Sequence, residues 1–225
     1  FHAEIVSHPH SFTALMAETS FINSLADTDV EDSATTRGAN GCHVHISRTA
    51  FVDDKHYAKW YFLIHQMKDI NQFIGGRELT GYCKFSPSGK IFTKENKQGG
   101  DDRGLMVNER NQATVECRFF AGSNDVSQVK VYVQYLESLI KYTKYSGDTV
   151  STSEWLAYVK RKKKYALLIA KMDTCTLPID YTVEYRAPVK TMAQWANLTM
   201  GQVSGITKIK ISGEWRDFNN CYIER

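Results

Sequence analysis

The segment Gly41–Ser47 constrains the fold most strongly, because two histidines alternate in it with β-branched residues. Successive side chains of a β-strand point to opposite faces, so we expect His43 and His45 on one face and Val44 and Ile46 on the other. A rigid strand that holds two imidazoles side by side is suited to binding a metal ion or a phosphate group. The alternative is a strand with two surface histidines and no ligand.

Composition narrows the class of protein without identifying it. The chain has 225 residues, of which 42% are hydrophobic and 24% charged, as is typical of a globular protein with one large domain or a domain and an appendage. The net charge of +3 is too small to predict binding to nucleic acid or to a membrane surface. No apolar run approaches the roughly 20 residues of a membrane span. Five scattered cysteines without a Cys-x-x-Cys pair favour a reducing, cytoplasmic location.

A second distinctive segment, residues 114–120, follows a predicted strand at 103–108 and a polar turn at 109–113. Alternation predicts that Glu116 and Arg118 share one face of this strand with Thr114 and Phe120. The opposite face is predicted to hold Val115, Cys117 and Phe119. An adjacent acid and guanidinium can form an ion pair, which contributes little when it is exposed. Alternatively, the carboxylate binds a cation and the guanidinium binds a phosphate oxygen.

Two apolar helices are predicted beside these strands. One follows Phe51, has a wide apolar face and ends at Gly75 and Gly76. The other follows a turn at residues 122–124, and its many apolar residues predict that it packs behind the sheet. Between them, residues 87–102 are rich in Lys, Gly, Asn and Asp, which predicts an exposed loop that could close over a site.

The C-terminal part of the chain contains fewer chemical signals. A helix capped by Thr152 or Ser153 is predicted to continue through the basic residues 161–164, which we interpret as a solvated face rather than a nucleic-acid patch. Residues 179–225 are expected to form short strands at 181–185 and 206–211 around a helix at 192–200.

Four segments of the chain, in this order, resemble the amidoligase family of phages and mobile elements, which is distantly related to glutamine synthetase and glutamate–cysteine ligase. They are Glu-Ile-Val-Ser-x-Pro at residues 4–9, Gly-x-His-Val-His-Ile-Ser at 41–47, Arg103 with Val107-Asn108, and Thr-Val-Glu-x-Arg-Phe-Phe-x-Gly-Ser at 114–123. The resemblance covers about residues 1–145. It implies an α+β fold like the glutamine synthetase catalytic domain, in which helices pack on one face of a curved antiparallel sheet. We expect residues 1–178 to form this domain and residues 179–225 to be a C-terminal extension.

The resemblance also implies an ATP- and magnesium-dependent carboxylate–amine ligase. Such enzymes phosphorylate a carboxylate with ATP, and an amine then attacks the acyl phosphate, while the protein positions the groups and neutralises charge. By motif position, Glu4 is implied to bind one Mg²⁺ or Mn²⁺ ion, and His43 and Glu116 are implied to bind another. The implied phosphate contacts are His45 to the nucleotide, Arg118 to the nucleotide's transferred phosphoryl group or the substrate carboxylate, and Arg103 and Arg110 to other phosphate oxygens.

The family also has a Glu-x-Glu pair on a strand before the first of these segments, and no such pair precedes Glu4. Either that strand lies upstream of this sequence or the protein has lost part of its site, and because the sequence begins with Phe1 rather than Met we expect the first. Two alternatives remain: a non-catalytic phage virion or host-interaction protein, and a zinc hydrolase built on His43, His45 and Glu116. The expected partners are thus carboxylate and amine substrates or a phage or host protein, with no nucleic acid or membrane, in the host cytoplasm or the virion.

Overall fold

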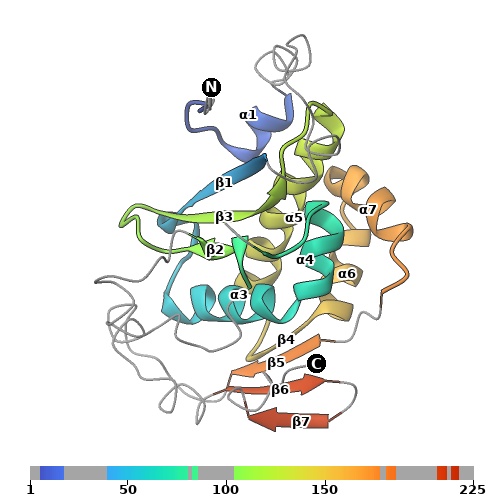
Figure 1. Ribbon diagram of the computed structural model, residues 1–225. Helices are drawn as coiled ribbons and strands as arrows, with labels where there is room; N and C mark the ends of the chain where they lie inside the picture. The colour runs from blue at the N-terminus through green and yellow to red at the C-terminus, as the bar shows by residue number, and fades with distance from the viewer. Residues whose placement is uncertain are drawn as a thin grey trace.

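The computed structural model describes residues 6–17, 40–80, 83–85 and 104–177, and three later strands at 181–185, 207–211 and 214–217. It combines helices with antiparallel sheets, which confirms the mixed α and β class (Figure 1). Glu4, Arg103, the predicted loop at 87–102 and the predicted helix at 192–200 lie outside the described residues. Within the described residues, no helix has the length and apolar character needed to cross a membrane.

The first sheet joins the two segments that the sequence marks as distinctive. It contains β1 (Gly41–Ser47), β3 (Thr114–Ala121) and β2 (Val107–Asn108), all antiparallel, in the order β1-β3-β2. The predicted strand before the turn is thus confirmed, although it is shorter than expected. In β1 and β3, His45 pairs with Glu116, so the histidine strand and the carboxylate strand are neighbours.

The apolar residues of β1 and β3 lie on the other face of this sheet. Val44 pairs with Cys117 and Ile46 pairs with Val115. All four side chains belong to the hydrophobic core or pack against it, which confirms the predicted alternation in this part of the sheet. Burying a side chain of this size contributes about 1.5–3 kcal/mol, so a slip of one residue in register would be costly.

A β-bulge near the end of β3 changes the face on which Phe120 lies. Two residue steps in β1, from Cys42 to Val44, match three steps in β3, from Phe120 to Cys117. The extra residue turns Phe120 to the helix side, where its ring stacks on Tyr132 with 4.4 Å between the ring centroids. The prediction that Phe120 shares the polar face is therefore wrong, because strict alternation is interrupted at a bulge.

The predicted helix after Phe51 is two helices, α3 (Asp54–Gln66) and α4 (Lys68–Gly75). They meet at the fully buried Met67, whose φ of −85° and ψ of 36° are not helical. The Asn71 side-chain amide donates a hydrogen bond (2.6 Å) to a carbonyl oxygen in the last turn of α3. This buried oxygen therefore has a partner even though the helix is broken. α4 ends as predicted, with Gly76 in the left-handed conformation.

The helix α5 (Val126–Tyr145) covers the apolar face of the first sheet, as predicted. Its Tyr132 and Tyr135 contact Phe120 and Phe119 of β3, respectively. Figure 1 shows α5 behind the sheet and α3 and α4 beside it. The sheet therefore has one face in the core and one face available for a site.

The helix predicted to begin at Thr152 or Ser153 is interrupted. The chain forms β4 (Thr149–Ser151), α6 (Thr152–Lys160), the 3-10 turn Lys163–Tyr165 and α7 (Ala166–Asp173). The basic residues 161–164 therefore lie between two helices and not within one. The N-cap of α6 is Ser151, whose Oγ accepts a hydrogen bond from the Glu154 N–H (3.2 Å), so the prediction of Thr152 or Ser153 is displaced by one or two residues.

A second antiparallel sheet forms from β4 and the late strands β5 (Tyr181–Tyr185), β6 (Thr207–Ile211) and β7 (Glu214–Asp217), in that order. The first two late strands confirm the prediction, and β7 was not predicted. Two further short elements are α1 (Phe12–Ala17), which begins after Ser11, and the 3-10 turn Arg48–Ala50 after β1.

Candidate functional site

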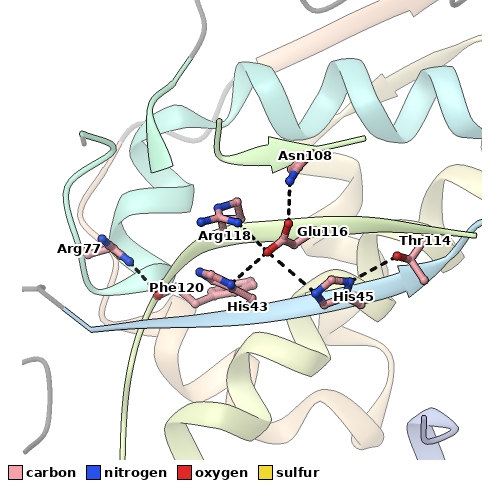
Figure 2. Close-up of polar contacts among 8 residues, drawn as sticks. All are labelled: His43, His45, Arg77, Asn108, Thr114, Glu116, Arg118 and Phe120. Atoms are coloured by element: carbon pink, nitrogen blue, oxygen red, sulfur yellow. Dashed lines mark hydrogen bonds and ion pairs between the residues drawn. The ribbon is translucent and has the colours of Figure 1, made fainter. Parts of the chain in front are cut away.

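A cluster of polar side chains lies on the face of the first sheet that does not pack on the helices (Figure 2). All three strands contribute to it. We call it the Glu116 cluster, and its members are His43 and His45 of β1, Asn108 of β2, and Thr114, Glu116 and Arg118 of β3.

The Glu116 carboxylate is the centre of the cluster. Its Oε1 lies 2.8 Å from Arg118 Nη1 and 3.0 Å from His43 Nδ1. Its Oε2 accepts a hydrogen bond of 2.8 Å from the Asn108 amide. Hydrogen bonds to an ionised acceptor are stronger than those between neutral groups, so this carboxylate is firmly held by side chains of all three strands.

The environment of Glu116 keeps it ionised. Only 9% of the residue is exposed, and this burial raises the pKa of its carboxyl group. The hydrogen bonds from His43 and Arg118 and the electrostatic interactions with both outweigh burial, and they lower the pKa of Glu116 to about 2. Glu116 therefore carries a negative charge at physiological pH.

His45 is the most exposed of the ionisable members. Half of its side chain is accessible, compared with 28% for His43. Its Nδ1 lies 3.3 Å from the Thr114 hydroxyl, and its Nε2 lies 3.9 Å from Glu116 Oε1, which is too long for a hydrogen bond. His45 can thus turn a nitrogen toward a ligand without breaking a strong contact within the cluster.

The structure brings together four of the predicted site residues: His43, His45, Glu116 and Arg118. Arg110 lies in the turn between β2 and β3, where its side chain is exposed.

The backbone N–H of Arg110 donates to Asn108 Oδ1 (3.0 Å), so it helps to hold the amide that binds Glu116. The phosphate contact of the Arg110 guanidinium stays a prediction. Glu4 and Arg103 lie outside the described residues.

The turn that precedes β3 is braced from α3 and from the end of β1. Arg48 donates to the carbonyl oxygens of Glu109 (2.9 Å) and Asn111 (3.2 Å). The buried Tyr57 hydroxyl donates to the Glu109 carboxylate, and burial raises the pKa of Tyr57 well above its ordinary value. These contacts fix the hairpin that positions Asn108 against Glu116.

Two residues, one within the Glu116 cluster and one beside it, received no role from the sequence. Asn108 lies within one of the four family-like segments, and pairing the two strands of the hairpin places it opposite Glu116, so the hairpin pattern could have identified it. Arg77 follows α4 and donates a long hydrogen bond (3.5 Å) to the Phe120 carbonyl oxygen at the end of β3. No local pattern marks Arg77, because its position depends on how α4 packs against the sheet.

The Glu116 cluster offers few ligands to a metal ion. Within the described residues, no group of three or more His, Cys, Asp or Glu side chains is arranged to hold a metal, so the three-ligand zinc site on His43, His45 and Glu116 is not formed. Magnesium needs fewer protein ligands, because it retains water and binds substrate phosphates. His43 Nδ1 and Glu116 Oε1 lie 3.0 Å apart because they share a hydrogen bond, so a metal ion bound by both side chains would have to replace that hydrogen bond.

Comparisons with known proteins identify no relative: no protein-family model, no curated protein and no solved structure matches this chain. The amidoligase resemblance therefore remains an expectation that depends on four short segments.

Proposed function

We propose that this chain is an ATP- and magnesium-dependent carboxylate–amine ligase with a glutamine synthetase-like fold. One observation supports the proposal above all others. Glu116 is implied by the family-like motifs to be a metal ligand. It is an ionised carboxylate in contact with His43 and Arg118, on the face of an antiparallel sheet that helices do not cover. An acidic metal ligand beside a guanidinium is the combination that phosphoryl transfer requires.

The proposed reaction has two steps. A carboxylate oxygen of the acid substrate attacks the γ-phosphorus of ATP, and ADP leaves. The nitrogen of the amine substrate then attacks the acyl carbon, and phosphate leaves as the amide forms. Both steps need positioned donors for the phosphate oxygens rather than covalent chemistry by the protein. In this proposal Arg118, which pairs with Glu116, would neutralise the transferred phosphoryl group, and the exposed His45 would contact the nucleotide phosphates.

His43 and Glu116 would hold a magnesium ion, which supplies positive charge to the phosphate oxygens when it is bound. Because the pKa of Glu116 is about 2, its carboxylate loses no proton when it binds an ion, whereas His43 would first have to give up the hydrogen bond that it donates to Glu116. Asn108 orients the carboxylate through Oε2 and leaves Oε1 directed at His43 and Arg118.

Calorimetric titration of ATP with and without Mg²⁺ into the full gene product tests the proposal. We expect Mg²⁺-dependent binding that is lost in Glu116→Gln and His43→Ala, because each variant removes a metal ligand. The matched control is His10→Ala, which removes an exposed histidine distant in sequence from the cluster. ATP binding and turnover in Glu116→Gln and His43→Ala equal to those of the wild type would contradict the proposal.

A second candidate function, a non-catalytic phage virion or host-interaction protein, is favoured by a different observation. Both oxygens of Glu116 already accept hydrogen bonds, as expected for a cluster that serves only to join strands. This candidate predicts no nucleotide binding by the wild type, and it predicts that Glu116→Gln changes only the stability. Mg²⁺-dependent turnover of ATP by the wild type would exclude it.

A further inference from the structure

The guanidinium of Arg77 lies on the same sheet face as the Glu116 cluster. Gly41 and His43 are two residues apart in β1, so a side chain at position 41 would point to the face that holds His43. A Cβ atom at Gly41 would lie 2.7 Å from Arg77 Nη1 and 3.3 Å from His43 Nε2. The Arg77 guanidinium thus occupies the space that a side chain at position 41 would need, next to the His43 ring.

Two glycines bring Arg77 to this position. A Cβ atom at Gly75 would lie only 2.2 Å from the backbone oxygen of Phe119, so the last residue of α4 touches the backbone of β3. Gly76 has a φ of +69°, a conformation that L side chains rarely adopt, and it turns the chain at the end of the helix. The next residue, Arg77, then reaches the end of β1.

The hydrogen-bonding capacity of Arg77 is largely unused by the protein. Its guanidinium has five N–H groups, and within the described residues its hydrogen bond is the 3.5 Å contact to the Phe120 carbonyl oxygen. No carboxylate in the described part of the chain forms an ion pair with it. Arg118, in contrast, is paired with Glu116 (2.8 Å).

The charges at this end of the sheet favour an anion. Figure 2 shows the guanidiniums of Arg77 and Arg118 on this face, and the Glu116 carboxylate is paired with Arg118 (2.8 Å). A guanidinium with unused donors beside an imidazole is suited to a tetrahedral oxyanion, which accepts two parallel hydrogen bonds from the guanidinium fork.

We infer that Arg77, lodged in the space left open by Gly41 and adjacent to His43, forms a phosphate-binding site at this end of β1. The phosphate group is either inorganic phosphate or part of a nucleotide. The inference rests on the proposed function only in the second case, in which Arg77 is an additional substrate-binding residue of the ligase site.

Calorimetric titrations of the full chain with inorganic phosphate and, separately, with Mg²⁺-ATP test this inference. We expect Arg77→Gln to weaken binding of the phosphate group about tenfold or more, because a charged hydrogen-bond donor is lost. Arg77→Lys should restore part of the affinity, because it keeps the charge but not the fork. Gly41→Ala should also weaken binding without changing the charge, because its Cβ displaces the guanidinium.

Arg161→Gln is the matched control, since Arg161 is exposed after α6 and uses its side chain to contact the Ala157 carbonyl oxygen (3.1 Å). Circular dichroism establishes that each variant is folded. The inference is overturned if folded Arg77→Gln has unchanged affinity for both ligands. It is also overturned if the wild type binds neither inorganic phosphate nor Mg²⁺-ATP.

The outcomes separate this inference from the proposed function. Phosphate binding that depends on Arg77, without any ATP turnover, supports the phosphate site and contradicts the ligase. Mg²⁺-ATP binding that is lost in Glu116→Gln, together with an unchanged affinity of Arg77→Gln for both ligands, supports the ligase and overturns the role of Arg77.

Discussion

Glu116 has a structural role at the residue scale that is independent of any reaction. Its carboxylate joins side chains from the three strands of the first sheet, and it is buried while remaining ionised. A buried charge of this kind is tolerated because His43, Arg118 and Asn108 replace the water that it loses. Removing the charge should therefore affect the stability of the protein as well as its function.

We expect Glu116→Gln to lower the free energy of unfolding by about 1–3 kcal/mol at neutral pH, because buried donors lose their ionised acceptor. In the folded protein the pKa of Glu116 is about 2, below its ordinary value of 4.5. The charge therefore contributes its full stabilisation above about pH 4.5 and loses it as the pH falls toward 2. Urea denaturation of both proteins at several pH values measures the difference. A difference that stays constant between neutral pH and about pH 2 would contradict this assignment.

At the scale of secondary-structure elements, interruptions decide which side chains meet. The bulge in β3 places Phe119 and Phe120 together against α5 and leaves Arg118 on the polar face. The break at Met67 separates α3 from α4 and allows the end of α4 to approach β3. Each interruption is short, and each changes the orientation of the residues that follow it.

The close approach of α4 to β3 predicts a large effect of a small substitution. Gly75→Ala should destabilise the protein by roughly 1–3 kcal/mol, because its Cβ would lie 2.2 Å from the Phe119 backbone oxygen and the strand cannot move aside cheaply. The control is Gly147→Ala, where a Cβ would meet no atom within 4 Å and should leave the melting temperature nearly unchanged. Equal melting temperatures for the two variants would show that α4 does not pack this closely.

The N-cap of α6 provides another prediction at this scale. Ser151→Ala should cost about 0.5–2 kcal/mol, because the Glu154 N–H at the start of the helix loses its acceptor. Ser127→Ala is the comparison, since Ser127 is exposed in the first turn of α5 and is not a cap. Chemical denaturation measures both. A loss in Ser151→Ala no greater than that in Ser127→Ala would show that the cap contributes nothing.

At the scale of the whole molecule, the core buries histidines as well as aromatic residues. His65 is 2% exposed, its ring stacks on Tyr61, and its Nδ1 lies 2.8 Å from the Tyr61 carbonyl oxygen. Burial lowers the pKa of His65 to about 4, although the hydrogen bond to Tyr61 opposes this shift. Burial also lowers the pKa of His56, so both histidines resist protonation in the folded state.

The protein should therefore lose stability in mild acid. The unfolded chain binds a proton at His65 near pH 6.5, whereas the folded chain binds it only near pH 4, so the free energy of unfolding falls as the pH decreases between these values. His65→Gln removes this titration and should flatten the dependence, whereas His10→Gln, at an exposed position, should not. Thermal denaturation between these pH values measures the slopes. Identical slopes in His65→Gln and the wild type would contradict the prediction.

Local patterns in the sequence determined the strands of the site and the faces of most of their residues. The alternation in residues 41–47 and 114–118 is a property of any extended chain with one buried face, so it suffices to place His43 with His45, and Glu116 with Arg118, on the polar faces of their strands. The late strands at 181–185 and 207–211 followed from the same kind of pattern. Gly76 ended its helix for the local reason that a left-handed residue favours glycine.

Only the tertiary structure decided where these elements are interrupted and which side chains from other elements lie beside them. The bulge that turned Phe120, the break at Met67 and the interruption at residues 161–165 each depend on contacts with distant parts of the chain, which local propensity does not contain. Arg77 is the clearest case. Its guanidinium reaches the face of His43 because a helix packs its terminal glycine against a strand more than 40 residues later in the sequence, and no pattern in the sequence records that approach.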